Sequence, residues 1–374
     1  MDRREFGSSS VFIGDDAYEA IADVLSDARC ILLVHGRSYA RFVELASFIE
    51  SLPARIVHFT GYSPNPLYEE ALEGRKLFLS EGCDAIVTVG GGSAIDTAKA
   101  IKLFSAMADC DDYLAAPAVR SAVSHVAVPT TAGTGSEGNG NIVLYRNGVK
   151  QSLHEDFVVP EYAVLVPALV KSLPDYQKKS TALDAYCQCF ESLWAVAATD
   201  ESRRYAAEGL RLLDANIERY FDGDVSVAGS MQLGAHYSGR AIDISKTTAA
   251  HAMSYKLSSM YGIAHGHAVA LTLPHICALT VERLEEDGDA THGKLRSALQ
   301  TIRDIISPDG NWHDVTIRLF DVLGKAAFAP LAQAAVGDIS ILVESVNPVR
   351  LGNNPLALDE RDLNELYRKV FFSE

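Results

Sequence analysis

Short apolar runs alternate with helical patterns over the first half of this 374-residue chain, and the alternation stops near residue 167. The strand patterns are rich in Val, Ile and Leu and occupy residues 30–34, 54–59, 84–89, 125–129, 141–145 and 162–166. Amphipathic helix patterns lie between them at 66–81 and 93–104. Strands that alternate with helices predict a parallel sheet with helices on both faces, because parallel neighbours need long crossover connections.

Helical patterns alone fill the second half, at 174–196, 202–220, 227–244, 249–260 and 360–371. The chain is also longer than a typical single hydrophobic core supports. We therefore expect two domains, an α/β domain at 1–167 and an all-α domain at 168–374.

Composition limits the possible partners. The net charge of −16 argues against a nucleic-acid or anionic-membrane partner, although a local basic pocket can still bind an anionic substrate. No apolar run approaches the roughly 20 residues that span a bilayer, and the N-terminal sequence MDRREFGSSS lacks a signal-peptide core. The six cysteines are scattered and form no CxxC pair, so we expect reduced thiols in a cytoplasmic protein.

A glycine-rich turn, Gly90-Gly91-Gly92-Ser93, joins the strand at 84–89 directly to the next helix. In such a turn the backbone N–H groups and the helix N-terminus can hold a phosphate, and Ser93 can cap the helix or bind a phosphate oxygen. Asp96 lies on the same face of the first helical turn, where it also suits the helix dipole. The alternative is a tight strand-to-helix connection without a ligand.

A second polar loop, TTAGTGSE, follows the strand at 125–129 and contains Thr130, Thr131 and Ser136. Hydroxyl groups and glycines at the carboxyl end of a parallel strand are typical of a nucleotide crevice. An ordinary turn has a similar composition, so both interpretations stay open.

Three histidines, His251, His265 and His267, lie among small and apolar residues between 246 and 271. A buried imidazole needs a hydrogen-bond partner or a metal ion. His251 lies within a predicted helix, and His265 lies after Gly262, where that helix ends and another begins. The two can converge between helices on a metal ion, or each can simply bond a carbonyl group in the core.

The segments GGGSAIDTAK (90–99), PTTAGTGSE (129–137) and HAMSYKLSSMYGIAHGHA (251–268) resemble, in this order, the iron-dependent (group III metal-dependent) alcohol dehydrogenase family. The resemblance implies the fold shared with glycerol dehydrogenase and dehydroquinate synthase. That fold has a Rossmann-like dinucleotide-binding α/β domain, an all-α domain that binds metal and substrate, and a cleft between them.

The resemblance also implies which residues bind the cofactor. Gly90, Gly91, Gly92, Ser93 and Asp96 would hold its pyrophosphate and nicotinamide side. The other wall and the ribose contact would come from Thr130, Thr131, Ser136 and Lys150.

The residues after the first strand, Gly36, Arg37 and Ser38, include no carboxylate, whereas similar enzymes use an acidic residue there to bind a ribose 2′-hydroxyl group. Arg37 and Ser38 can instead bind a 2′-phosphate. We therefore expect the protein to accept NADPH as its cofactor, with NADH as the alternative.

For the metal, Fe²⁺ or Zn²⁺, the resemblance implies Asp184, His251 and His265 as ligands. The fourth family ligand is a histidine four residues after the aspartate, and here that position is Gln188. Gln188 shares a helix face with Asp184 and can bind the metal through its amide oxygen. An amide oxygen is a weaker ligand than imidazole for these ions, so we expect a weaker or more selective site. A second departure is Tyr255, which stands where many members have a histidine facing the nicotinamide.

Longer segments, including DYQKKSTALDAYCQCFESLWAV and VNPVRLGNNPL, resemble a subset of the family, the phosphonoacetaldehyde reductases. This resemblance implies reduction of a small aldehyde, phosphonoacetaldehyde, to 2-hydroxyethylphosphonate by hydride transfer, with a metal that polarises the carbonyl group. His267 would relay a proton or support the site, and Tyr255 would pack on the nicotinamide or donate a hydrogen bond. A phosphonate also requires a nearby cation, for which the candidates are Lys178, Lys179, Lys246 and Arg350.

The remaining alternatives are a reductase of another small aldehyde, a dehydroquinate-synthase-like or glycerol-phosphate-type enzyme on the same fold, a metal-free descendant, and a structural protein that binds nucleotide for regulation. The apolar run around His251 argues against a cyclase, which needs a lysine- and arginine-rich pocket. Three of the family's ligands in place argue against a decayed site. Similar enzymes are homodimers or larger homo-oligomers, and we expect the same here.

Overall fold

The computed structural model describes residues 1–287, 292–329, 331 and 336–372, and the side chains of these residues except 336 and 337. Backbone contacts divide the chain into two compact units. The first contains residues 1–131 and 135–172, and the second contains 132–134 and 173–374.

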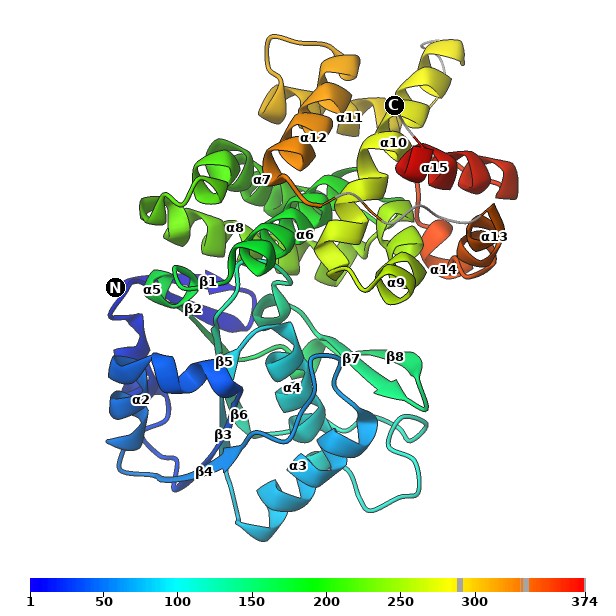
Figure 1. Cartoon of the computed structure of the whole chain (residues 1–374). Coiled ribbons are helices and arrows are strands. Elements are labelled where there is room, and N and C mark those ends of the chain that lie inside the picture. Colours follow the sequence, from blue (N-terminus) through cyan, green and yellow to red (C-terminus); the bar gives the residue numbers. More distant parts are fainter. Residues whose placement is uncertain (288–291, 330, 332–335, 373–374) are drawn as a thin grey trace. The chain divides into compact units, whose positions relative to one another are not determined.

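A mainly parallel sheet forms the centre of the first unit (Figure 1). Its strands, in spatial order, are β1 (Asp2–Phe6), β2 (Ser9–Ile13), β9 (Tyr162–Leu165), β6 (Ser124–Pro129), β5 (Ala85–Gly90), β3 (Cys30–His35) and β4 (Arg55–Phe59). Only the β1–β2 pair in this sheet is antiparallel. The predicted strand at 141–145 forms, but it lies outside this sheet in a two-stranded antiparallel ribbon of β7 (Asn141–Arg146) and β8 (Val149–His154).

Both faces of the sheet are covered by helices, as Figure 1 shows for α2 (Val43–Glu50) on one side and α3 (Tyr68–Ser80) with α4 (Gly92–Ala106) on the other. Along β3, Ile31 and Leu33 pack in the same cluster as the apolar residues of α2. Leu32 and Val34 point the opposite way and pack with residues of α3 and α4. Residues 30–34 of β3 are all buried because successive side chains enter the cores on opposite faces of the sheet, which explains the continuous apolar sequence.

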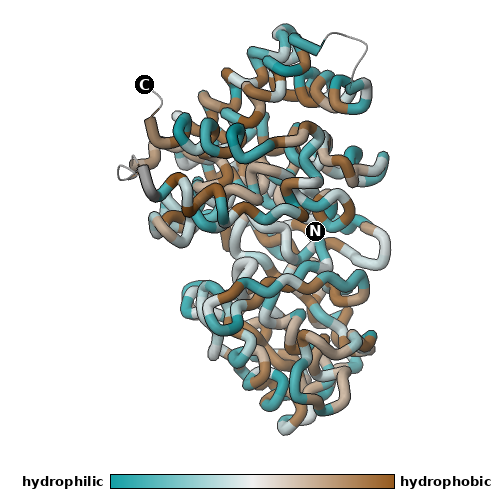
Figure 2. Tube along the Cα trace, turned by 90° about the vertical axis from the view of Figure 1, so that its right-hand side faces the viewer, coloured by the Kyte–Doolittle hydropathy of each residue, from teal (hydrophilic) through white to brown (hydrophobic). Residues whose placement is uncertain are grey.

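Helices make up the regular structure of the second unit wherever that unit is described. The long ones are α6 (Asp175–Trp194), α7 (Asp200–Phe221), α8 (Ala228–Ser245), α9 (Ala249–Tyr261), α10 (His265–Glu286), α11 (Gly293–Ile306), α12 (Trp312–Ala326) and α15 (Glu360–Phe372), and the short ones include α13 (Val336–Glu344) and α14 (Pro348–Leu351). Hydropathy changes repeatedly along these helices, as expected for amphipathic segments (Figure 2). Helix α6 is different, because residues 180–194 are all buried among the other helices.

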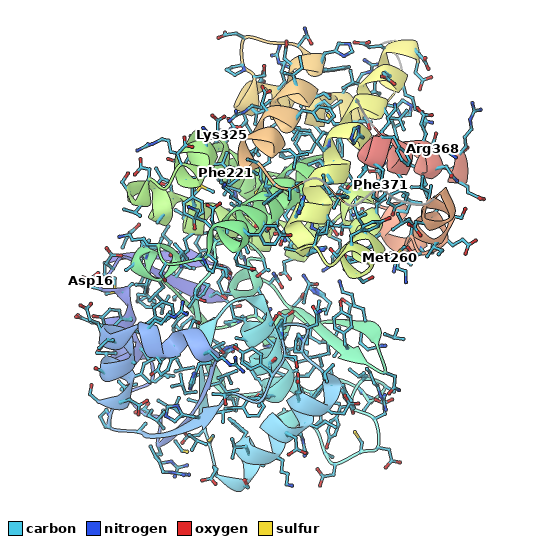
Figure 3. All side chains as sticks on the ribbon, viewed as in Figure 1. Asp16, Phe221, Met260, Lys325, Arg368 and Phe371 are labelled. Atoms are coloured by element: carbon cyan, nitrogen blue, oxygen red, sulfur yellow. The ribbon has the colours of Figure 1, made fainter. Side chains whose placement is uncertain are left out.

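The predicted fold class is therefore confirmed: an α/β unit with a mainly parallel sheet precedes a helical unit. Side chains fill the spaces between the ribbons within each unit (Figure 3). No helix in the described part of the chain is both long and apolar enough to cross a membrane.

Candidate metal centre and nucleotide-binding turn

Three side chains of the second unit, Asp184, His251 and His265, form a cluster that we call the candidate metal centre. Each offers one ligand atom, and these atoms all lie within 4.8 Å of one another. Asp184 comes from the middle of α6, His251 from the first turn of α9, and His265 is the first residue of α10. Carboxylate and imidazole groups are common ligands of Fe²⁺ and Zn²⁺, so the donor set fits such an ion.

Two atoms in this cluster are buried without a hydrogen-bond partner, Oδ1 of Asp184 and Nε2 of His251. They face each other at 3.4 Å, and both residues are at least 95% buried. Leaving such polar atoms unpaired is costly, by about 1–3 kcal/mol each. An ion placed between them would satisfy both, which is the observation that best supports a metal site here.

The electrostatics of the cluster also call for a cation. Burial lowers the pKa of His251, but the carboxylates of Glu191 and Asp184 outweigh this effect and raise it to about 9. Burial raises the pKa of Asp184, but the imidazoles of His251 and His265 outweigh it and hold the pKa below its ordinary value. The buried carboxylates of Asp184 and Glu191 thus favour a positive charge at His251. Either a proton on the imidazole or a divalent ion bound to it can supply that charge.

Glu191 orients His251 from behind. Its Oε2 atom pairs with Nδ1 of His251, while its Oε1 atom accepts hydrogen bonds from the Thr248 hydroxyl group at 2.6 Å and the Ala250 backbone N–H at 2.9 Å. A carboxylate on Nδ1 fixes the ring so that Nε2 is the metal-binding atom. The Glu191 side chain is fully buried, and these contacts keep its pKa below the ordinary value although burial alone would raise it.

Close packing of α10 against α6 brings His265 to Asp184. A Cβ atom on Gly266 would lie 2.7 Å from Cβ of Asp184 and closer still to the carbonyl oxygen of Ser180. Only glycine fits at this position without a shift of one of the helices. Gly266 therefore sets the spacing between His265 and Asp184 in the candidate metal centre.

Gln188, one turn after Asp184, is buried, but its amide oxygen already has a partner. Oε1 lies 2.9 Å from the hydroxyl group of Ser238, which donates to it. The Gln188 side chain also helps to lower the pKa of Asp184 by hydrogen bonding. Because only the amide nitrogen can donate to a carboxylate, that nitrogen faces Asp184. Metal ligation by Gln188 stays a prediction, and in this orientation the residue instead supports Asp184.

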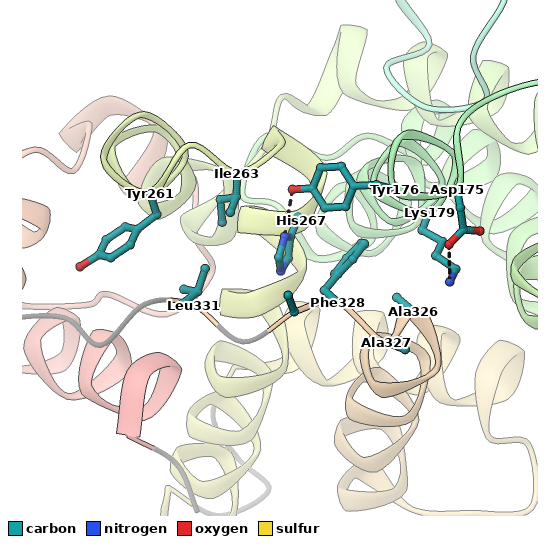
Figure 4. Close-up of a pocket in the computed structure, with 11 residues that line it drawn as sticks. Asp175, Tyr176, Lys179, Tyr261, Ile263, His267, Ala326, Ala327, Phe328 and Leu331 are labelled. Atoms are coloured by element: carbon teal, nitrogen blue, oxygen red, sulfur yellow. Dashed lines mark hydrogen bonds and ion pairs between the residues drawn. The ribbon is translucent and has the colours of Figure 1, made fainter.

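Tyr255 contacts His265, whereas His267 contacts Tyr176 and Phe328. The ring of Tyr255 stacks on that of His265, with centroids 5.5 Å apart and planes inclined by 3°. His267 faces a pocket of about 330 Å³, where Nδ1 lies 3.2 Å from the hydroxyl group of Tyr176 and the ring packs on Phe328 (Figure 4). Burial lowers the pKa of His267 to about 4, so its ring is neutral at pH 7. The catalytic roles predicted for both residues stay predictions.

The glycine turn of the first unit has the predicted strand–turn–helix form. It joins β5 to α4, and Gly91 is the N-cap residue of α4 without a side-chain hydrogen bond. A Cβ atom on Gly90 would lie 2.5 Å from that of Ala94, so glycine is needed for this tight turn. Ser93 donates its hydroxyl group to the carbonyl oxygen of Pro64 and does not cap the helix. The first N–H groups of α4 are thus left to an anion rather than to a capping side chain.

Asp96 and Ser136 join a buried network around Lys99. Nζ of the fully buried Lys99 donates to the hydroxyl group of Ser136 at 2.8 Å and to the carbonyl oxygen of Asn141 at 2.9 Å. Ser136 donates in turn to Asp96, which also accepts from the Val143 N–H group at 3.1 Å. The two residues therefore hold the polar loop against α4, in addition to any contact with a cofactor.

The other predicted cofactor residues belong to the first unit. Thr131 lies against the glycine turn, because a Cβ atom on Gly91 would be 3.2 Å from its Cγ2 atom. The Thr130 N–H group donates to the carbonyl oxygen of Gly90 at 3.0 Å. Lys150 lies on β8, and Arg37 is exposed just after β3, between Gly36 and Ser38.

The description "iron-containing alcohol dehydrogenase" belongs to a family model that matches residues 8–167, and the model of the C-terminal part of the same family matches residues 178–371. The chain belongs to the iron-containing alcohol dehydrogenase family. The first model matches residues of the α/β unit, and the second matches residues of the helical unit. Members of this family are oxidoreductases.

The named relatives of this chain differ in substrate. Phosphonoacetaldehyde reductase of Streptomyces viridochromogenes is 30% identical over 332 residues, which cover 84% of this chain and 82% of that protein. NADPH-dependent butanol dehydrogenase of Clostridium saccharobutylicum is 22% identical, over 97% of this chain and 96% of that protein. Sulfoacetaldehyde reductase of Bifidobacterium kashiwanohense, solved with NAD⁺, has a TM-score of 0.88 with 23% identity and full coverage of both chains, which supports the fold.

Two residues of this family member were missed by the sequence reasoning, Glu191 and Lys99. Asp184, Gln188 and Glu191 follow one another at i, i+4 and i+7 on α6, so the stripe itself is a signal of a shared polar face. Lys99 lies three residues after Asp96 and ends the GGGSAIDTAK motif. A charged residue at such a position looks like solvated surface in sequence, which is why neither was singled out.

Proposed function

We propose that the protein is a metal-dependent, NAD(P)H-linked aldehyde reductase whose substrate is phosphonoacetaldehyde, which it reduces to 2-hydroxyethylphosphonate. The observation that carries the metal-dependent chemistry is the pair of buried, unpartnered atoms of Asp184 and His251 that face each other at 3.4 Å. The phosphonate substrate is supported by the 30% identity to a phosphonoacetaldehyde reductase over 84% of this chain.

In this proposal, a divalent ion held by Asp184, His251 and His265 would act as a Lewis acid toward a carbonyl oxygen, and a dihydronicotinamide would supply the hydride to the carbonyl carbon. Glu191 holds Nδ1 of His251, so that Nε2 would be the atom that binds such an ion. Tyr255 buttresses His265 by stacking on its ring. A neutral His267, paired with the hydroxyl group of Tyr176, is suited to pass on the proton that the alkoxide oxygen takes up.

The glycine turn and Arg37 support a phosphorylated dinucleotide as cofactor. The uncapped N-terminus of α4 suits the pyrophosphate. Exposed Arg37, in a segment without a carboxylate directly after β3, suits a 2′-phosphate, so we propose NADPH as the favoured cofactor.

The test is NADPH oxidation with a panel of aldehydes, with and without a chelator. We expect turnover of phosphonoacetaldehyde well above that of unsubstituted alkyl aldehydes, loss of activity with the chelator, and recovery on addition of Fe²⁺ or Zn²⁺. Equal activity on simple alkyl aldehydes would contradict the substrate, and activity that resists chelation would contradict the metal-dependent mechanism.

A further inference from the structure

Arg350 lies at the end of a row of side chains that starts at the candidate metal centre. Its Cζ atom lies 5.5 Å from the ring centroid of Tyr255, in cation–π contact. The Tyr255 ring stacks in turn on the ring of His265 at 5.5 Å. The row therefore connects a guanidinium group to a candidate metal ligand through one aromatic ring, within the second unit.

The backbone that carries Arg350 is held in place by two asparagines. Oδ1 of Asn347 accepts the N–H group of Arg350 at 3.1 Å, at the start of α14. Nδ2 of Asn353 donates to the carbonyl oxygens of Ser245 at 2.8 Å and Thr247 at 3.0 Å, which ties this segment to the link between α8 and α9. A positioned arginine loses little freedom when it binds a ligand, so this arrangement is preorganised.

The charge of Arg350 is not neutralised by the protein. Its Nη1 atom donates to the hydroxyl group of the buried Thr247 at 2.6 Å. Within the described residues, no carboxylate lies at ion-pair distance from this partly buried guanidinium group, which has five N–H donors. The group therefore retains donors for an anion, and the Thr247 hydroxyl group retains its own proton.

The other cations considered for the substrate are already engaged. Lys178 and Lys179 both pair with Asp175, at 3.5 Å and 2.8 Å. Lys246 donates to the carbonyl oxygen of Asp243 at 2.6 Å. Arg350 is thus the candidate whose fork of donors best suits a tetrahedral oxyanion.

We infer that Arg350, together with the hydroxyl group of Thr247, binds the acid group of the substrate, and that this contact makes the enzyme select aldehydes with a phosphonate or sulfonate group. This inference rests on the proposed aldehyde reduction, because it assigns a binding site to the acid group at the other end of the same substrate. The inference therefore places the carbonyl group of the substrate at the candidate metal centre and its acid group at Arg350.

Substitution of the guanidinium group tests the inference. In Arg350→Met, kcat/KM for phosphonoacetaldehyde falls by about 10- to 100-fold, mainly through KM, because a charge-assisted hydrogen bond to the substrate is lost. For propanal, which has no acid group for Arg350 to bind, kcat/KM falls much less. Arg350→Lys retains the charge without the fork and gives an intermediate loss. The matched control is Arg368→Met on α15, at an exposed arginine labelled in Figure 3. It changes kcat/KM for neither phosphonoacetaldehyde nor propanal.

Sulfoacetaldehyde tests whether Arg350 also binds a sulfonate group. Arg350→Met should lose activity on phosphonoacetaldehyde, on sulfoacetaldehyde or on both, according to which acid group Arg350 binds. An equal loss on propanal and on both acids would show that Arg350 only supports the fold, and an unchanged KM for both acids would place the anion elsewhere. Either result overturns the inference.

Binding of ethylphosphonate, which has no carbonyl group, separates the failure of this inference from that of the proposed function. Calorimetry with the metal-loaded protein should show binding that Arg350→Met weakens at least 10-fold and Arg368→Met does not. If the wild-type protein reduces no aldehyde but this difference persists, the proposed function is wrong and the anion site stands. If both variants bind ethylphosphonate like the wild type, the anion site is wrong.

Discussion

Replacing Gly266 by alanine tests how the candidate metal centre is assembled. The added Cβ atom would lie 2.7 Å from Cβ of Asp184, whereas non-bonded carbon atoms prefer about 3.5–4.0 Å. Helix α10 must therefore move away from α6 by roughly 1 Å. This movement costs about 1–3 kcal/mol as overpacking, which lowers the melting temperature by roughly 2–4 °C per kcal/mol in a unit of this size.

The same movement carries His265 away from Asp184. A misplacement of about 1 Å reduces the rate of a well-oriented site by roughly 100-fold, so we expect a comparable loss of kcat and a clear loss of affinity for Fe²⁺ or Zn²⁺. Calorimetric metal titration, thermal melting and NADPH-linked aldehyde reduction measure the three effects on one preparation.

Gly324→Ala on α12 is the matched control, because a Cβ atom there meets nothing within 4 Å. In an open helical position, alanine raises stability by about 0.5–1 kcal/mol and leaves metal affinity unchanged. If Gly266→Ala binds metal as tightly as the wild type and melts at the same temperature, the argument from close packing is refuted.

Three further predictions follow from single side chains. Glu191→Gln should reduce metal affinity by about 10- to 100-fold because the amide no longer holds the metal-binding tautomer of His251, and an unchanged titration would contradict this. Burial, with a smaller contribution from Lys369, lowers the pKa of His275 to about 4, so the unfolded chain takes up a proton below about pH 6.5 that the folded protein refuses. The contribution of His275 to the free energy of unfolding is therefore complete above pH 6.5 and is lost toward pH 4. His275→Leu should narrow the difference in melting temperature between pH 7.5 and pH 5, and a difference equal to that of the wild type would refute this prediction. Arg37→Ala should reduce kcat/KM for NADPH about 10-fold or more relative to NADH, and a constant ratio would exclude contact with the 2′-phosphate.

The sequence predicted the inner strands well because burial on both faces produces continuous apolar runs, as in β3 and β5. It did not predict β1, whose sequence DRREF is mostly exposed and charged, or β8, whose residues lie on a ribbon with little burial. The sequence pattern also did not indicate which strands pair with one another. The apolar residues of β7 indicate a strand, but they do not say that it pairs with β8 rather than with the main sheet.

The candidate metal centre was predictable in part. His251 and His265 stand out because imidazoles are unusual among small apolar residues. Asp184 required the family resemblance, since an aspartate in a long helix usually faces solvent. The turn of the Gln188 amide toward Ser238 depends on a hydroxyl group 50 residues away, and no local pattern contains that information.

Locating the bound metal tests the central claim most directly. Crystals of the protein loaded with Fe²⁺ or Zn²⁺, measured on both sides of the metal absorption edge, give an anomalous difference map that places the ion. We predict a single strong peak within coordination distance of Oδ1 of Asp184, Nε2 of His251 and the imidazole of His265. A peak elsewhere, or a fully loaded protein with no peak among these three side chains, would contradict the account.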